Sequence, residues 1–309
     1  MSIREKNMYF QDRFQYNAFG LNIHSDIELP ELTPFENIQH DITICLGDVP
    51  DFLENPTKKG ARFHISHDSF LLKKDNVAKY LALNGNKIVI EKAPGAEDED
   101  IRLFLLTSVL GALLHQRGLF PLHASAVKVG NECVVFCGKS GAGKSTIANG
   151  FFKRGYDLHT DDISVTKINK KGIPLVFPGY PQLKLWEDVL VKFEKDIANF
   201  NRVRPVLNKY FFPVGKSFST TPLKLKKIYI LVPWNKKDFE FINVTGAEKF
   251  SILKKQTYRS NFTDGLGKAP DQFKLASAIG KQTPVSIVRR PRKPFLLNEL
   301  VDFIEKDFQ

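Results

Sequence analysis

The sequence contains little cysteine, methionine or tryptophan, with three, two and two residues of each in a chain of 309. The cysteines, Cys45, Cys133 and Cys137, are odd in number and form no CxxC pair, and no His/Cys cluster has zinc-ligand spacing. This argues against a disulfide-stapled or zinc-dependent fold. We expect buried thiols in a reducing compartment, and hence a cytoplasmic protein.

Long hydrophobic runs are also missing. The most apolar stretch, residues 103–114, is too short to span a bilayer and is typical of a buried helix. The first six residues contain no apolar segment of the kind found in a signal peptide. We therefore expect no membrane partner.

The charge is unbalanced, with a formal net charge of +11. Small basic clusters occur at residues 224–227 and 289–293, but no basic stripe interleaved with aromatic residues and no nucleic-acid-binding motif is present. We interpret these clusters as a solvated basic surface and expect no nucleic-acid partner.

Residues 1–95 are predicted to form a β-rich N-terminal region. Short apolar runs alternate with turn residues, and Asn84-Gly85 is a strong hairpin signal between residues 80–83 and 87–90. No catalytic pattern occurs here, so substrate binding is one open interpretation. Further strands are predicted at 14–16, 21–23 and 41–45.

Residues 96–309 are predicted to form a second domain of α/β class with a mixed sheet. A helix is expected over about 98–117, followed by a strand at 121–129, a turn at Gly130-Asn131 and an apolar strand at 133–137. A hairpin at this position is not what a serial βαβ chain would give. Later strands are expected at 156–160, 163–168, 173–177, 227–232, 239–244 and 285–288, and helices at 187–199, 246–258, 270–279 and 295–308.

A phosphate-binding loop follows the apolar strand. Its motif is G-x-x-x-x-G-K-S, and the next residues, up to Arg154, are predicted to form a helix that ends at Gly155. Main-chain N–H groups of such a loop and the helix N-terminus bind phosphate oxygens. Lys144 is expected to contact the β- and γ-phosphates, and the Ser145 hydroxyl to bind Mg²⁺. The predicted nucleotide-binding residues are Gly138, Lys139, Ser140, Gly141, Ala142, Gly143, Lys144, Ser145 and Thr146.

Two adjacent carboxylates, Asp161 and Asp162, end the next predicted strand. Neighbouring side chains on a strand point to opposite faces, so we expect the two to have different roles. One is suited to Mg²⁺, directly or through water. The other is suited to accept the proton of an attacking hydroxyl.

These motifs together resemble the C-terminal domain of HPr kinase/phosphorylase, over roughly residues 120–190. The shared series runs from His123 through the phosphate loop and Arg154-Gly155-Tyr156 to Asp161-Asp162. The likeness is closest to related serine kinases, which include kinases of lasso-peptide precursors. It implies a mixed-sheet core like that of phosphoenolpyruvate carboxykinase, ATP and Mg²⁺ as cofactors, and oligomers of unspecified size.

The resemblance also implies residue roles. Asp162 would be the proton acceptor, His123 would lie in the active site, and Arg259 matches a loop where the family places a functional arginine. Two departures, Thr146 and Gln182, stand where HPr kinases carry glutamate. Gln182 would then be a weaker metal ligand beside Ser145 and Asp161. These departures argue against HPr kinase itself and its reverse phosphorylase activity.

Several cations are candidates for stabilising the transferred phosphoryl group. They are Lys184, Arg202, Arg204 and Arg259. Trp186 and Tyr180 are candidates for stacking on adenine or substrate, although core packing is the simpler interpretation.

The sequence thus predicts an ATP-dependent kinase acting on a serine or threonine hydroxyl of a peptide or small protein, a ribosomal precursor peptide of the lasso type being one such partner. Three alternatives stay open. They are a kinase of free serine or a sugar hydroxyl, HPr kinase proper, and a nucleotide-dependent module or slow ATPase without transfer.

Overall fold

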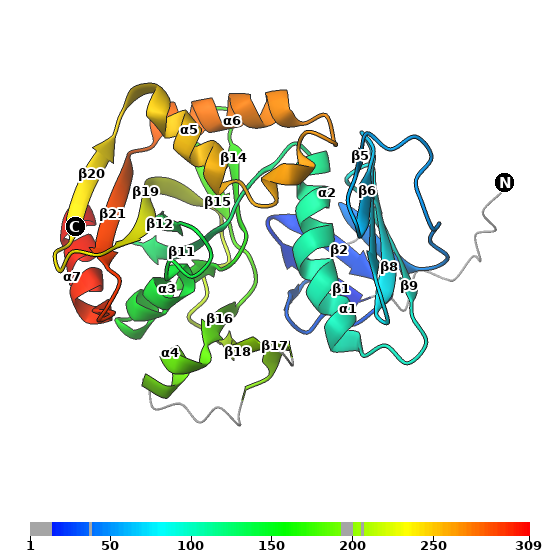
Figure 1. The fold of residues 1–309 in the computed structure, drawn as a ribbon, viewed down its shortest axis with the longest axis horizontal. Helices are drawn as coiled ribbons and strands as arrows, with labels where there is room; N and C mark the ends of the chain where they lie inside the picture. Colours follow the sequence, from blue (N-terminus) through cyan, green and yellow to red (C-terminus); the bar gives the residue numbers. More distant parts are fainter. Residues whose placement is uncertain (1–13, 37–38, 193–199, 205–206) are drawn as a thin grey trace.

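A computed structural model describes residues 14–36, 39–192, 200–204 and 207–309. The protein is a mixed α/β structure with two large sheets, the first formed by residues 14–92 and the second by residues 120–291 (Figure 1). A long helical segment lies between them. Among the described residues, no helix is long and apolar enough to cross a membrane.

The N-terminal sheet has the strand order β3-β1-β2-β4-β9-β8-β7-β6-β5. Neighbouring strands are antiparallel except at β2–β4 and β4–β9. Asn84 and Gly85 both have positive φ and connect β8 to β9, which confirms the predicted hairpin. The strands are β1 (Phe14–Ala18), β2 (Leu21–Ser25), β3 (Thr33–Pro34), β4 (Ile42–Leu46), β5 (Lys58–Lys59), β6 (Phe63–Ile65), β7 (Ser69–Lys74), β8 (Ala78–Leu83) and β9 (Lys87–Lys92).

The predicted helix over residues 98–117 is confirmed as three consecutive segments. These are α1 (Asp98–Phe104), a π-helical stretch (Leu105–Val109) and α2 (Leu110–Gln116). Acidic residues occupy its first turn, where they interact favourably with the helix dipole. The helix packs on the N-terminal sheet, and the buried Tyr80 hydroxyl donates to the Ile101 carbonyl at 3.0 Å.

The second sheet is mixed, as predicted. Its strands follow the order β10-β14-β15-β19-β12-β11-β13, and β21 adds to β19 and carries β20. Strand β12 is antiparallel to β11 and parallel to β19, which is parallel to β21. The strands are β10 (Phe120–Leu122), β11 (Ala124–Val129), β12 (Glu132–Cys137), β13 (Leu158–Thr160), β14 (Ser164–Ile168), β15 (Pro174–Phe177), β19 (Leu223–Trp234), β20 (Glu240–Val244) and β21 (Val285–Pro291).

Helices cover both faces of this sheet (Figure 1). Along β12, Val134 and Phe136 pack toward α3 (Lys144–Lys153) and α7 (Leu297–Phe308). Cys133, Val135 and Cys137 pack toward the other face, which α5 (Gly246–Gln256) and α6 (Ala269–Gln282) cover. The alternation follows from the two-residue period of a strand. It also confirms that these two cysteines are buried.

A small third sheet lies beside α3, with strand order β16-β18-β17. Its strands are β16 (Gln182–Trp186), β17 (Arg202–Arg204) and β18 (Leu207–Pro213), and α4 (Glu187–Lys192) follows β16. The sequence predicted a helix over 187–199, and residues 193–199 lie outside the described residues. Strand β16 was not predicted, because the preceding Pro/Gly-rich segment gives no strand signal and the pairing comes from the distant β18.

The N-terminal sheet and the rest of the chain share a hydrophobic core. Ile163, Val165, Tyr180 and Tyr258 pack in one cluster with the buried side chains of β1–β9 and of the α1–α2 segment. The turn between β9 and α1 contains residue 95, where the domain boundary was predicted. That division into two domains stays a prediction.

Candidate active site

The phosphate loop lies where the sequence predicted it, between β12 and α3. Gly138 has a φ of 147°, and a Cβ there would lie 2.8 Å from the carbonyl oxygen of Leu231 on β19. Gly143 is left-handed with a φ of 100° and precedes the first helical residue, Lys144. A side chain at Gly138 would therefore collide with main chain, and the loop can pass this close to β19 only with glycine.

Lys144 is folded back over the loop. Its Nζ donates to the carbonyl oxygens of Gly138 at 3.0 Å and Lys139 at 3.3 Å. Burial lowers the pKa of Lys144. A phosphate oxygen in this position would replace the two carbonyls as acceptor and favour the charged ammonium.

The topology places His123 against Asp162. The sequence predicted one strand over 121–129, but the structure has two, because β10 pairs with β14 while β11 pairs with β12 and β13. His123 stands at the break. The chain crosses the same break between β13 and β14, so Asp161 and Asp162 face it. His123 Nδ1 lies 3.1 Å from the main-chain oxygen of Asp162 and 3.4 Å from its carboxylate.

The Asp162 carboxylate is paired with Lys184 of β16, whose Nζ donates to Oδ2 at 2.9 Å. Side-chain exposure is 18% for Asp162 and 7% for Lys184. Burial opposes the charge on Asp162, but the Lys184 ammonium outweighs it and holds the pKa of the carboxyl well below its usual range. Burial likewise opposes the charge on Lys184, but Asp162 outweighs it and raises the pKa of the ammonium. Both groups are therefore ionised at neutral pH.

Asp162 also has a strained backbone for a non-glycine residue, with a φ of 69°. Aspartate tolerates the left-handed region better than most residues, at a cost of about 1–2 kcal/mol. The turn directs the carboxylate toward His123 and Lys184 and not along the strand. Such strain is frequent at functional sites.

Asp161 has a different environment, as its position next to Asp162 on a strand end predicted. Its Oδ1 accepts from the Ser125 hydroxyl at 2.5 Å, and its Oδ2 accepts from the main-chain N–H of Lys184 at 2.9 Å. Both carboxylate oxygens are thus used by the protein. Asp161 does not line the cavity that contains Ser145 and Asp162, so its position fits a bracing role better than the metal role predicted for it.

His123 is held neutral. Burial, and then the Lys144 ammonium, lower the pKa of this histidine. A main-chain oxygen can only accept, so the hydrogen bond to Asp162 requires the proton on Nδ1. This leaves Nε2 as the basic nitrogen of the ring.

These groups line one cavity of about 770 Å³, which we call the nucleotide cavity. It contains the loop residues Ser140, Gly141, Gly143, Lys144, Ser145 and Thr146, together with His123, Asp162, Lys184 and Trp186. Its volume falls within the range of roughly 300–1,000 Å³ that is typical of ligand pockets. Trp186 is 41% exposed and faces this space, whereas Tyr180 is buried elsewhere.

A second cavity of about 310 Å³ lies on the other side of Lys184, and we call it the side cavity. Gln182 and Tyr180 line it, and Gln182 does not line the nucleotide cavity. The prediction that Gln182 joins Ser145 at a metal ion is therefore not supported by its position. On β16, alternate residues Gln182 and Lys184 lie on one face, and only Lys184 borders both cavities.

Arg259 also lies outside the nucleotide cavity. It is exposed, has a φ of 49°, and stacks over the ring of Tyr258 at 5.6 Å. Tyr258 separates it from His123, whose ring centroid lies 5.7 Å from that of Tyr258. Arg202 donates through Nε to the Tyr210 hydroxyl at 2.9 Å and does not line the cavity either. The side chain of Arg204 lies outside the described residues.

Basic residues that the sequence analysis assigned to surface lie at the cavity instead. Arg290, at the end of β21, donates through Nε and Nη2 to the carbonyl oxygen of Ala142 at 3.1 and 2.8 Å. Arg292, Lys209 and Phe295 also line the cavity. The sequence feature that could have indicated these residues is the basic cluster at 289–293. Its proximity to the phosphate loop follows only from the parallel pairing of β21 with β19.

The donor set of the nucleotide cavity fits Mg²⁺ bound together with phosphates. Mg²⁺ typically takes one or two protein ligands plus phosphate oxygens and water. The hydroxyl of Ser145 lines this cavity, and phosphate oxygens and water would supply the other ligands. Over the described ranges, no three His, Cys, Asp or Glu side chains gather into a site that would hold a metal alone.

Comparisons with known proteins give structural likenesses alone. No protein-family model matches the chain, and no curated protein matches it. One similar solved structure is the HPr(Ser) kinase/phosphatase from Coxiella burnetii, with 12% identity and a TM-score of 0.32 over 60% of this chain and 88% of that one. A likeness this distant says nothing about the reaction, which must be inferred from the residues of the site.

Proposed function

We propose that the protein is an ATP-dependent kinase that transfers the γ-phosphoryl group to a serine or threonine hydroxyl of a peptide or small protein. The phosphate loop before α3 supports nucleotide binding. The observation that carries the proposal further is the placement of the Asp162 carboxylate with Lys144 and Ser145 in one cavity. A phosphate loop alone would permit hydrolysis or simple binding.

In the proposed reaction, the acceptor oxygen attacks the γ-phosphorus while the bond to the β-phosphate oxygen breaks. The hydroxyl proton passes to the Asp162 carboxylate, and ADP leaves with the electron pair of the broken bond. Lys144 and the loop N–H groups hold the phosphates. Mg²⁺ at Ser145 would supply charge neutralisation when bound with the nucleotide.

Lys184 sets the basicity of Asp162. While it donates to Oδ2, the carboxylate is a weak base because its pKa is held below the usual range. A γ-phosphate entering the nucleotide cavity offers the Lys184 ammonium a second anionic acceptor. If the Lys184 ammonium shares its hydrogen bonds between Asp162 and the γ-phosphate, the pKa of Asp162 rises while the acceptor is bound. The same ammonium would stabilise the negative charge that develops on the phosphoryl group.

A small-molecule acceptor, such as free serine, is the second candidate. The small size of the side cavity favours it, because 310 Å³ is at the lower end of ligand-pocket volumes. The same machinery would serve either acceptor.

The experiment uses γ-labelled ATP, Mg²⁺ and a cytosolic extract of the source cell, with Lys144→Ala as control. Label on a peptide or protein hydroxyl that is absent from the control supports the proposal. Label only on a small metabolite selects the second candidate. Label only in free phosphate, in amounts independent of added extract, would refute kinase function in favour of an ATPase.

A further inference from the structure

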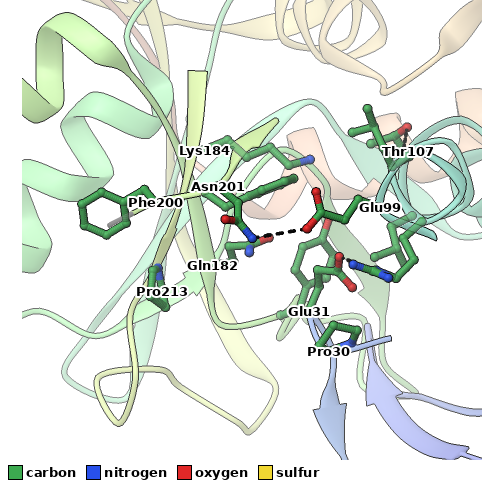
Figure 2. A pocket seen from close by; sticks show the side chains of 14 residues that line it. Pro30, Glu31, Glu99, Thr107, Gln182, Lys184, Phe200, Asn201 and Pro213 are labelled. Atoms are coloured by element: carbon green, nitrogen blue, oxygen red, sulfur yellow. Dashed lines mark hydrogen bonds and ion pairs between the residues drawn. The ribbon is translucent and has the colours of Figure 1, made fainter. Parts of the chain in front are cut away.

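The side cavity adjoins the active site through a single shared residue, Lys184. One wall comes from the N-terminal half, through Glu31 after β2 and Glu99 of α1 (Figure 2). The opposite wall is β16, with Gln182 and Lys184. A molecule in this cavity therefore lies next to the ammonium that holds the Asp162 carboxylate.

Both cations that line the side cavity are already paired. Arg102 Nε donates to Glu31 Oε1 at 2.9 Å, and Lys184 Nζ donates to Asp162 Oδ2. Hydrogen-bond acceptors remain. Glu31 Oε2 and Gln182 Oε1 are buried, and neither bonds with any residue that the structure describes. An unmatched buried acceptor is costly, and a ligand donor toward which these two side chains turn would remove that cost.

The rim of the side cavity carries an additional negative charge. Glu99 is exposed, and its carboxylate accepts a hydrogen bond from Asn201 Nδ2 (Figure 2). The two atoms lie 3.4 Å apart. Among the described residues it forms no ion pair with lysine or arginine. The other charged residues that line the side cavity are paired, so Glu99 gives it one uncompensated negative charge.

We propose that the side cavity binds a positively charged group of the phosphoryl acceptor, namely a lysine or arginine side chain close to the target serine of a peptide. This rests on the proposed kinase function and specifies its substrate. A cation seated between Glu99, Glu31 and Gln182 places the neighbouring hydroxyl on the Lys184 and Asp162 side. The same chemistry would recognise the ammonium of a free amino alcohol, and the experiment separates the two sources.

The test uses acetylated heptapeptides with a central serine and one arginine at each position in turn, each matched by a norleucine peptide. At the favoured position, arginine should raise kcat/KM about tenfold over norleucine, as expected for a charge-assisted hydrogen bond. The Glu99→Arg variant should abolish this preference and favour a glutamate peptide. Glu97→Arg, two residues away and outside the cavity, introduces the same charge change into the helix start and should keep the arginine preference.

Calorimetric titration of the same peptides separates this inference from the kinase function. Selective binding of the arginine peptide without phosphorylation would support the cavity assignment and refute the kinase. Phosphorylation with equal kcat/KM for the arginine and norleucine peptides at every position would support the kinase function and refute the cavity assignment. Free serine or ethanolamine as the sole acceptors, with KM raised by Glu99→Arg, supports the cation site with a small-molecule source. Unchanged preference in Glu99→Arg, or no binding of any peptide or amine, overturns the inference.

Discussion

Replacing Lys184 by methionine removes the cation that stabilises Asp162 and keeps a similar apolar length. The pair lies at 2.9 Å with 7% and 18% of the side chains exposed, so solvent cannot replace the lost partner well. Removing one member of a buried ion pair leaves the other charge without a partner and lowers the free energy of unfolding by about 3–5 kcal/mol. At roughly 2 °C for each kcal/mol in a chain of this size, we expect Tm to fall by about 6–10 °C at neutral pH.

The pH dependence of this loss has a definite sign. In the wild type, Lys184 holds the pKa of Asp162 below that of the unfolded chain, so the stabilisation is present above about pH 3.9 and is lost as pH falls through the folded value. In Lys184→Met, the largest cause that opposes burial is gone, so the pKa of Asp162 rises above its wild-type value. Acid then protonates the unpaired carboxyl and relieves the penalty. The difference in Tm should therefore shrink between pH 7 and pH 4.

The assay is thermal unfolding across pH, together with phosphoryl transfer, which should fall about 10²-fold. Lys171→Met, at an exposed turn, is the matched control and should change neither the Tm nor the rate of phosphoryl transfer. The double variant with Asp162→Asn should be more stable than the sum of the single changes predicts, by about 2 kcal/mol. Strictly additive effects, or a Tm difference that grows in acid, would refute the pairing argument.

Three further predictions concern the loop and the core. Gly138→Ala should destabilise the protein by about 2 kcal/mol more than Gly141→Ala in urea unfolding, since a Cβ at 138 lies 2.8 Å from a main-chain oxygen and one at 141 meets nothing within 4 Å. Arg290→Met should weaken ATP binding about tenfold in calorimetry, because the Ala142 carbonyl loses two charged donors. Burial lowers the pKa of His159 to about 4, so about 3 kcal/mol of stability should be lost as pH falls from 6.5 to 4.

Each of these has a contrary outcome. Equal destabilisation by the two glycine changes would show that backbone strain, which both share, decides the cost. Wild-type ATP affinity in Arg290→Met would show that Arg290 does not support the phosphate loop. An intermediate ATP affinity in Arg290→Lys, which keeps the charge, is consistent with that support. A His159→Gln variant, neutral at every pH, should lose less stability in acid. If the stability of that variant falls with pH as steeply as in the wild type, His159 is not the group responsible for the loss.

Local patterns predicted much of the fold. Asn84-Gly85 forms its hairpin, the acidic run at 97–100 opens its helix, and the turn at 130–131 connects antiparallel strands before the phosphate loop. The π-helical stretch and β16 were missed. Both depend on packing or pairing partners far away in the sequence, which local composition does not encode.

The site was predicted in part for the same reason. Adjacency in sequence suggested two roles for Asp161 and Asp162, and the family resemblance implied that His123 lies in the active site. The partner of Asp162 is Lys184, 22 residues later, and the brace of the loop is Arg290, almost 150 residues later. No feature of the neighbouring sequence distinguishes these two cations from Arg259 or Arg202, which do not line the nucleotide cavity. Only the order of strands in the sheets separates them.

The central claim is that Asp162 accepts the proton of an attacking hydroxyl. The most direct measurement compares wild type with Asp162→Asn for ATP binding by calorimetry and for label transfer from γ-labelled ATP to the acceptor found in the extract. The amide keeps the size of the side chain and removes the base. We predict ATP affinity within about threefold of wild type and transfer reduced by at least about 10²-fold. Transfer at the wild-type rate with normal ATP binding would contradict the claim.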